Sequence, residues 1–312
     1  MEKNSDSLVI TNGRFSLGVA PGLGGSLTHL AWTADGRPEV DLLRRSGAAD
    51  IASGNPSRLA SFVMVPFTNR IDAGRIPLPS SSDPRHAVEV PINRPTQNVA
   101  IHGFGRSAPW EVVEATASRL KLTQSFQTAG NPYDYLAEQT FELGQDDVSC
   151  RVRVTNRGQA GLPFGIGFHP WFDRTSAATL TLPAAQAFRM DDRDMPREAM
   201  PLETVFGSKN SDGSCTMTIA AKTPFDTPVS GWSGRAIVTW PERKTALTIA
   251  GEGALRLVHI FSPKEPAVFC VEPVSHLPDV VNRRHLAAYG DMTLLAPGAS
   301  MEGSMRLTPQ TI

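Results

Sequence analysis

Short runs rich in β-branched and aromatic residues, each bounded by turn formers, recur along nearly all 312 residues of the chain. In residues 7–20 two such runs flank Asn12-Gly13, and an Asn-Gly pair between alternating residues strongly predicts a β-hairpin. Residues 110–128 and 136–158 each predict a further strand pair, whereas residues 40–45 and 58–62 could form one or two helical turns. Many short strands between turn clusters favour a sandwich or barrel. With no linker or repeat in view, we expect one all-β domain over residues 1–312.

The charge balance limits the kinds of partner. The chain has 30 Lys and Arg against 31 Asp and Glu, so it lacks the basic character of a nucleic-acid binder. Its apolar runs are far shorter than the roughly 18–20 residues that cross a bilayer. We therefore expect neither nucleic acid nor membrane as a partner. A neutral or weakly charged small molecule fits better.

The cysteines and the first residues indicate the compartment. Cys150, Cys215 and Cys270 are odd in number and widely spaced, which predicts buried free thiols rather than a disulfide framework. The polar start MEKNSDSLVI has no apolar signal-peptide core. We therefore expect a cytoplasmic protein.

Two segments combine arginine with polar or aromatic residues. Asn69 and Arg70 follow an apolar strand, and the planar guanidinium fork of arginine suits a hydroxyl-rich or carboxylate ligand. His102 precedes a Gly-rich bend, with Arg106 and Trp110 beyond it. We expect the Trp110 indole to offer a stacking surface for a sugar ring. Solvated surface arginines and a core histidine are the alternative interpretations.

The segment PFGIGFHPWF, residues 163–172, is more informative. Strand alternation places Gly165, Gly167 and His169 on one face, and glycines inside a strand usually mark the close approach of a ligand or of another backbone. We expect the two glycines to clear space beside His169. Pro170 then ends regular pairing and should hold the imidazole at an edge.

Two carboxylates complete the candidate set. Glu272 ends an apolar strand and shares a face with Cys270, so burial should raise its pKa and make it a better base at neutral pH. An ion pair between Glu272 and Arg70 is the rival account. Asp226 lies in a turn-rich segment, where an aspartate is most often a turn former.

Several chemistries lack their motifs. The sequence holds no H-E-x-x-H, no paired C-x-x-C, no P-loop and no G-x-S-x-G, so we expect no metal and no cofactor. The other histidines are expected to be structural or superficial: His29, His86, His259, His276 and His285.

In their order along the chain, five segments resemble those of the aldose 1-epimerase (galactose mutarotase) family. They are Asn69-Arg70-Ile71, His102-Gly103, His169-Pro170-Trp171-Phe172, the loop with Asp226, and Val271-Glu272-Pro273. The resemblance implies a β-supersandwich with antiparallel sheets and an open sugar-binding cleft.

The same resemblance implies roles for individual residues. It makes Glu272 the general base and His169 the general acid, and it places Arg70, His102 and Asp226 at sugar-binding positions. Asn69, Trp171 and Arg106 complete the expected binding set, with Trp171 standing where the family more often has Tyr. The stretch HGFGR…PW also resembles sugar-phosphate epimerases, which leaves phosphorylation of the substrate open.

The expected function is therefore aldose 1-epimerase: interconversion of the α and β anomers of a free aldose, an aldohexose, by acid/base-catalysed ring opening. One carboxylate and one imidazole suffice for the proton transfers, without metal or nucleotide. A hexose-6-phosphate 1-epimerase and a non-catalytic carbohydrate-binding protein are the alternatives. A sugar lyase fits least, since the chain has only three Tyr. Monomer and homodimer both remain open.

Overall fold

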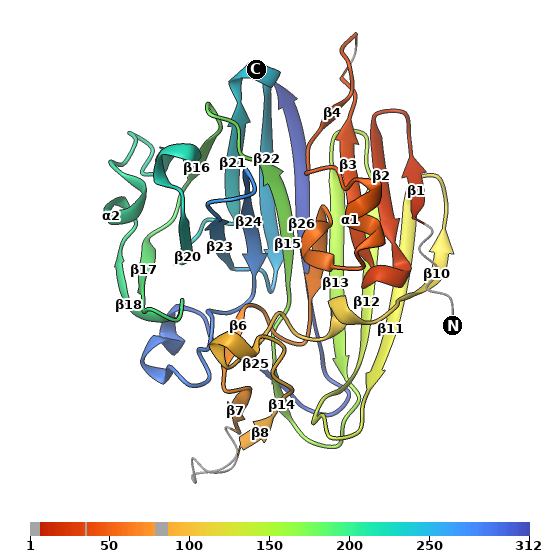
Figure 1. Ribbon diagram of the computed structural model, residues 1–312, viewed down its shortest axis with the longest axis vertical. Helices are drawn as coiled ribbons and strands as arrows, with labels where there is room; N and C mark the ends of the chain where they lie inside the picture. The colour runs from red at the N-terminus through yellow and green to blue at the C-terminus, as the bar shows by residue number, and fades with distance from the viewer. Residues whose placement is uncertain (1–6, 35, 79–86) are drawn as a thin grey trace.

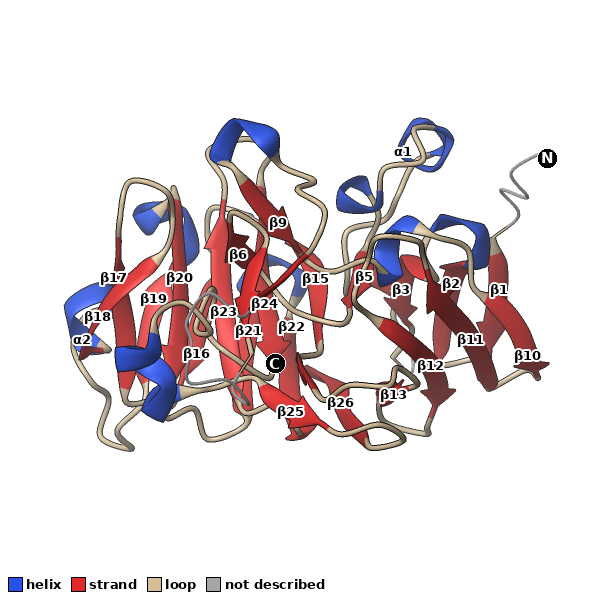
Figure 2. Ribbon diagram, turned by 90° about the horizontal axis from the view of Figure 1, so that it is seen from below, coloured by secondary structure: helices blue, strands red, loops and turns tan. Residues whose placement is uncertain are grey.

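The computed structural model describes residues 7–34, 36–78 and 87–312, and it builds almost entirely from antiparallel β-sheets (Figure 1). His86, expected to be structural or superficial, lies outside the described residues. Residues 1–6, part of the segment in which no signal-peptide core was found, also lie outside them. Two large sheets lie face to face as layers (Figure 2). The all-β prediction is confirmed.

The larger sheet has eleven strands, and its order places the later site strands side by side at its centre. In spatial order they are β1 (Leu8–Thr11), β2 (Phe15–Ala20), β3 (Ser26–Trp32), β5 (Ser61–Met64), β15 (Gly167–Asp173), β24 (Val268–Val274), β23 (Leu257–Ser262), β20 (Phe225–Ser230), β17 (Gln186–Met190) and β18 (Pro196–Pro201), with β4 (Val40–Asp41) paired to β3.

The second sheet has nine strands. In order they are β10 (Glu111–Ala115), β11 (Arg119–Gln127), β12 (Asp134–Leu143), β13 (Val148–Asn156), β26 (Ser300–Thr311), β22 (Thr245–Gly253), β21 (Arg235–Trp240), β16 (Thr179–Leu182) and β19 (Cys215–Thr218).

Small elements join and cover the two layers. Three two-stranded ribbons pair β6 (Arg70–Asp72) with β9 (Val99–Ile101), β7 (Arg75–Pro77) with β8 (Ala87–Glu89), and β14 (Leu162–Phe164) with β25 (Thr293–Leu295). The helices are α1 (Ala48–Ala52), α2 (Glu203–Phe206) and short 3-10 turns: η1 (Pro21–Leu23), η2 (Pro56–Arg58), η3 (Pro95–Gln97), η4 (Gly105–Ser107), η5 (Ile219–Lys222), η6 (Pro241–Arg243) and η7 (Arg284–Tyr289). No helix in the described ranges has the length and apolar character that crossing a membrane requires.

The predicted hairpins are confirmed. β1 pairs with β2 across Asn12-Gly13, and β10–β11 and β12–β13 pair as the other two runs indicated. The predicted helical turns at residues 40–45 and 58–62 are wrong for nearly all of these residues: Val40–Asp41 and Ser61–Phe62 belong to strands of the large sheet, and only Arg58 lies in a helical turn, at the end of η2. Val40 pairs with Trp32 and Ser61 pairs with Leu27, and such tertiary pairing overrides a weak local preference.

The main core lies between the two layers and decides which side chains face outward. On β15 and β24, Phe172 and Phe269 meet in this core with ring centroids 5.4 Å apart. Since successive strand residues point to opposite faces, His169 and Glu272 point away from the nine-stranded sheet. The core therefore supports the site strands from behind.

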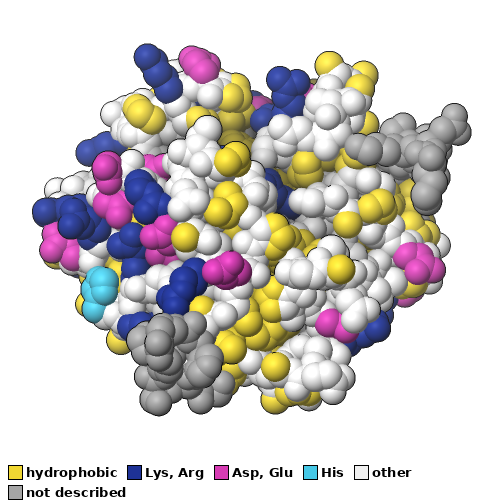
Figure 3. Space-filling view, turned by 60° about the horizontal axis from the view of Figure 1, so that its bottom comes forward, with side chains coloured by type: hydrophobic (Ala, Val, Ile, Leu, Met, Phe, Trp, Pro, Cys, Tyr) yellow, Lys and Arg dark blue, Asp and Glu magenta, His cyan; other side chains and the backbone are white. Residues whose placement is uncertain are grey.

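The expectation of free, buried cysteines is also met. Cys150, Cys215 and Cys270 are free and buried, and burial raises the pKa of the Cys150 thiol to about 12. On the face drawn in Figure 3, positive and negative side chains are intermingled, without a single basic field.

His276 is structural, as expected, and it predicts a pH dependence of stability. The fully buried imidazole donates from Nδ1 to Leu277 O (2.8 Å) and accepts at Nε2 from the Thr68 N–H (2.9 Å), so only the neutral ring satisfies both. Burial lowers its pKa to about 4 from 6.5. The unfolded chain therefore binds the proton first as pH falls, and up to about 3 kcal/mol of stability is lost between pH 6.5 and 4.

Urea unfolding at pH 7 and at pH 4.5 checks this prediction. The stability difference between the two pH values should be smaller in His276→Gln than in the parent protein. An equal difference in both proteins would show that His276 does not carry the effect.

Candidate active site

A pocket opens on the outer face of the large sheet, above four adjacent strands. Trp171, Cys270, Phe261 and Asp226 form one cross-strand row over β15, β24, β23 and β20, as the pairings of neighbouring strands require. In the next row His259 pairs directly with Glu272. His169 lies beside Glu272, between the paired positions Gly167–Val274 and Trp171–Cys270. We call the lining residues from these strands the sheet wall: His169, Trp171, Asp226, His259, Phe261 and Glu272.

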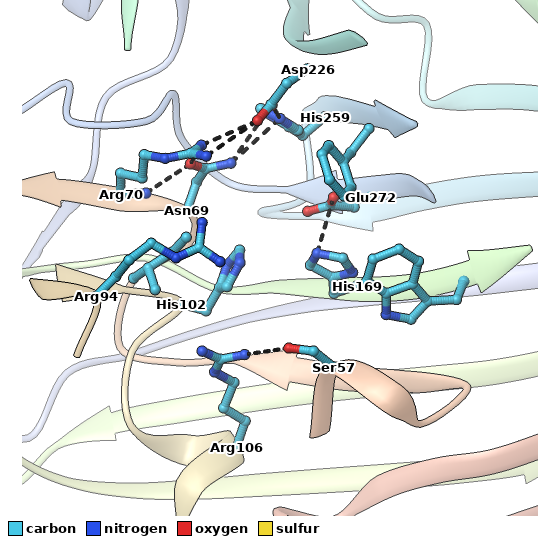
Figure 4. A pocket seen from close by; sticks show the side chains of 13 residues that line it. Ser57, Asn69, Arg70, Arg94, His102, Arg106, His169, Asp226, His259 and Glu272 are labelled. Atoms are coloured by element: carbon cyan, nitrogen blue, oxygen red, sulfur yellow. Dashed lines mark hydrogen bonds and ion pairs between the residues drawn. The ribbon is translucent and has the colours of Figure 1, made fainter. Parts of the chain in front are cut away.

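Short connecting segments supply the opposite side of the pocket. The β6–β9 ribbon pairs Arg70 with Ile101, and η2 and η4 lie beside it. We call these lining residues the loop wall: Ser57, Asn69, Arg70, Arg94, Ile101, His102 and Arg106. Every residue of the predicted catalytic and binding set thus lines one pocket (Figure 4).

Glu272 and His169 face each other at the centre of the sheet wall. His169 Nε2 lies 3.3 Å from Glu272 Oε1, and the two side chains are only 6% and 2% exposed. Glu272 Oε2 and His169 Nδ1 have no hydrogen-bond partner among the described residues. The pair therefore has polar atoms left over for a ligand.

Burial shifts both members of this pair toward their neutral forms. It raises the pKa of Glu272 well above its usual range, and the negative charge of Asp226 raises it further. It lowers the pKa of His169 well below 6.5, and the charge of Arg106 lowers it further. A single proton on the pair, held by the carboxyl beside a neutral imidazole, avoids burying two charges.

Asp226 is the centre of a second polar cluster. Its Oδ2 accepts hydrogen bonds from Arg70 Nη1 and Nη2, each at 3.3 Å, and its Oδ1 contacts His259 Nε2. Asn69 Oδ1 accepts from Arg70 Nη1 at 3.0 Å, and Asn69 Nδ2 lies 3.4 Å from the His259 ring. His259 and Arg70 lower the pKa of Asp226 despite the opposing effect of burial, so this carboxylate is ionised.

Three expectations are corrected by this cluster. Asp226 lies in strand β20, not in a loop. Arg70 forms ion pairs with Asp226 and with Asp194 (3.0 Å), not with Glu272. His259, expected to be structural or superficial, is 2% exposed and lines the pocket.

The loop wall is held by unusual backbone. His102 has a left-handed φ of 61°, which a non-glycine residue adopts only when its surroundings impose it. Next to it, Gly103 has φ 63°, and a Cβ there would lie 2.1 Å from Val65 O. The His102 ring lies 5.1 Å from the His169 ring, edge to face. Burial and the charge of Arg106 lower the pKa of His102 well below 6.5, so it faces the pocket as a neutral imidazole.

The predicted role of Gly165 and Gly167 is wrong. A Cβ at Gly165 would lie 2.1 Å from the His276 ring, and one at Gly167 would lie 2.9 Å from Thr68 and from Val274. The glycines admit neighbouring protein side chains and do not clear space for a ligand. Trp110 is likewise no stacking surface, because it is buried in the core and its indole N–H donates to Gly105 O at 2.8 Å.

Trp171, unlike Trp110, lines the pocket and can offer an aromatic surface to a ligand. Its ring centroid lies 4.9 Å from that of His169, and the guanidinium of Arg44 lies 5.1 Å from the centroid of the indole. The Trp171 Nε1 donor has no partner among the described residues. An indole with a free N–H at a pocket suits a ligand that has both an apolar face and hydroxyl groups.

One group of possible metal ligands occurs within the described ranges. Donor atoms of His169, Cys270 and Glu272 all lie within 4.8 Å of one another. Spacing motifs cannot reveal such a group, since its members come from two strands distant in sequence.

With this geometry in view, the comparisons decide the family. A family profile described as aldose 1-epimerase matches residues 6–308. The chain belongs to the aldose 1-epimerase family. The uncharacterized protein YphB of Escherichia coli (strain K12) is 26% identical over 269 residues, which cover 82% of this chain and 85% of YphB.

Solved structures with the same architecture include a galactose mutarotase-like protein from Clostridium acetobutylicum, with a TM-score of 0.82, 17% identity, and coverage of 98% of this chain and 95% of that one. A galactose mutarotase-like protein from Lactobacillus casei has a TM-score of 0.75, 18% identity, and coverage of 98% of this chain and 100% of that one. The expected galactose mutarotase-like β-supersandwich is thereby confirmed.

Proposed function

We propose that the protein is an aldose 1-epimerase that interconverts the α and β anomers of an aldose, with Glu272 as base and His169 as acid. The observation that carries the proposal is the contact between these two buried side chains, which face a pocket lined by hydrogen-bonding groups. Anomer exchange needs one proton removed and one delivered, and the pair offers both functions side by side.

The Glu272 carboxylate takes the proton of the C1 hydroxyl while the C1–O5 bond breaks and its electron pair goes to O5. His169, protonated by transfer from Glu272 as the sugar enters, gives its proton to O5, and a free aldehyde results. After rotation about C1–C2, the same transfers run in reverse and close the ring on the other face. Each positioned acid or base typically contributes about 10²- to 10⁴-fold.

The other lining groups bind and orient the sugar. Arg70, His102, Asn69 and Asp226 offer donors and acceptors to hydroxyl groups, and Trp171 offers an indole face and its N–H. Since Asp226 anchors both Arg70 and His259, the cluster presents fixed geometry rather than mobile side chains.

Polarimetry on freshly dissolved α-glucose and α-galactose, and NMR anomer-exchange measurements over a wider set of aldoses, test the proposal. The protein should accelerate the approach to the anomeric equilibrium of at least one aldose above a buffer blank. A non-catalytic carbohydrate-binding protein on the same fold is the main alternative. Binding of sugars without acceleration of any aldose would establish it.

The pH profile of kcat/KM should be bell-shaped, because the pair is active only with one proton. At the acid side a second proton binds, and the lowered pKa of His169 places this limb below pH 6.5. At the alkaline side the last proton leaves, and the raised pKa of Glu272 places that limb well above pH 4.5. NMR anomer exchange in buffer-corrected series measures the profile, and an acid limb at or above pH 6.5 would contradict it.

We also propose that residues 1–312 act as one domain, in the cytoplasm, as a monomer or homodimer. One hydrophobic core is continuous across both large sheets, which supports a single domain. The free thiols support the cytoplasmic location.

A further inference from the structure

Two cations line the pocket without a carboxylate partner among the described residues. Arg106 Nη1 donates to the Ser57 hydroxyl at 3.2 Å, and Arg94 Nη1 donates to the Gln97 side-chain oxygen at 3.3 Å. Arg70 differs, because it forms ion pairs with both Asp194 and Asp226. Arg94 and Arg106 therefore remain uncompensated beside the pocket that they line.

The charge balance of the lining leaves room for an added anion. Of the two lining carboxyl groups, Asp226 is already paired with Arg70, and burial favours the neutral form of Glu272. Burial and the charge of Arg94 lower the pKa of Arg106 to about 10, which still leaves it cationic at neutral pH. Arg94 is exposed, whereas Arg106 is half-buried. A half-buried cation without a counter-charge is costly, and a ligand anion removes that cost.

The position of Arg106 relative to His169 indicates where the anion belongs on the sugar. The Phe62 ring is stacked on His169 with centroids 4.4 Å apart, and the Arg106 guanidinium carbon lies 4.9 Å from the Phe62 centroid. The Phe62 ring thus contacts both Arg106 and His169, the residue that protonates O5 in the proposed mechanism. In an aldohexopyranose, O5 is bonded to C1 and to C5, and C5 carries the exocyclic carbon. Because the C1 hydroxyl faces Glu272, a substituent on the exocyclic carbon is the one left to reach toward Arg106 when O5 faces His169.

We infer that the preferred substrate is an aldose with an anionic group, a phosphate or a carboxylate, at the exocyclic carbon beside the ring oxygen, and that Arg106 and Arg94 bind this group. The inference rests on the proposed anomer exchange. Guanidinium groups match the planar, bidentate geometry of such anions. Ser57 adds a hydroxyl donor on the same wall. Figure 4 shows Arg106 and Ser57 below His169, with Arg94 on the side of His102.

The kinetic test compares glucose, glucose 6-phosphate and glucuronate as substrates of the full-length protein. We expect kcat/KM for at least one anionic sugar to exceed that for glucose by tenfold or more. Arg106→Gln and Arg94→Gln should each reduce this ratio by at least fivefold, and Arg106→Lys, which keeps the charge, by less. Arg189→Gln, which removes an exposed cation on β17, is the matched control and should leave the ratio unchanged. The inference is overturned if the parent protein has equal kcat/KM for anionic sugars and for glucose. It is also overturned if neither Arg106→Gln nor Arg94→Gln changes the ratio of these two values.

Calorimetric titration of the same three sugars separates the inference from the proposed function. Tighter binding of an anionic sugar that depends on Arg106 and Arg94 supports the inference even if no sugar is turned over, in which case the proposed anomer exchange fails. Acceleration of all three sugars with equal affinities keeps the function and overturns the inference. Preference for phosphate over carboxylate, or the reverse, identifies the anion.

Discussion

Glu272→Gln should lower kcat/KM for anomer exchange by about 10²- to 10⁴-fold, the range that one positioned general base contributes. The substitution keeps the shape of the side chain and its contact with His169 but removes the group that accepts the C1 hydroxyl proton. NMR anomer exchange measures the loss on the substrate that the parent protein turns over best.

The stability of Glu272→Gln should not fall with its activity. Burial disfavours ionisation of Glu272, and one of its oxygens has no partner among the described residues, so a neutral amide costs the folded state little. Urea unfolding should give a free energy equal to or above that of the parent protein. Glu302→Gln, on an exposed position of β26, serves as control for the same chemical change elsewhere. Activity of Glu272→Gln within tenfold of the parent would rule out its assignment as base.

Asp226→Asn should lower kcat/KM by roughly 10²-fold and the free energy of unfolding by about 2 kcal/mol. Loss of one partner from a buried ion pair typically costs about 3–5 kcal/mol, and we expect less because Asp194 still pairs with Arg70. The loss of activity has a separate cause. Without the carboxylate, both Arg70 and His259 lose the group that orients them.

A double-mutant cycle with Arg70→Gln tests whether the cluster acts as a unit. Residues that share one hydrogen-bond network give non-additive effects, so Arg70→Gln should cost less in an Asp226→Asn background than in the parent protein. Unfolding free energies and kcat/KM for the four proteins supply the cycle. Additive effects on both quantities would show that Asp226 and Arg70 act independently.

Local patterns in the sequence were sufficient for the hairpins, but not for β4 or β20, which lie in segments expected to form a helical turn and a loop. The Asn12-Gly13 turn and the alternating runs of β10 to β13 are signals within a few residues, and each gave a correct pair. The alternation around Glu272 correctly placed it on one face with Cys270. The order of five motifs indicated the family, which no single motif could do.

Contacts between distant strands explain what the sequence could not predict. His259 contacts Asp226 across β23 and β20, and only the register of these strands, which no local pattern encodes, brings them together. The glycine interpretation failed for a related reason: close approach was predicted correctly at Gly165, but the approaching group is His276 from far along the chain. Arg94 precedes a 3-10 turn in a segment without strand or helix signals, so nothing distinguished it from a solvated arginine.

The site has its acid/base pair on the central strands β15 and β24, whereas the two cations that have no carboxylate partner in the described part of the chain lie on short connecting segments. Connecting segments tolerate insertion and replacement far better than paired strands. A relative could therefore acquire a new sugar preference by exchanging η2, η3 or η4 while its chemistry stayed intact. For protein engineering, this makes η2, η3 and η4 the segments to randomise and the two central strands the part to leave untouched.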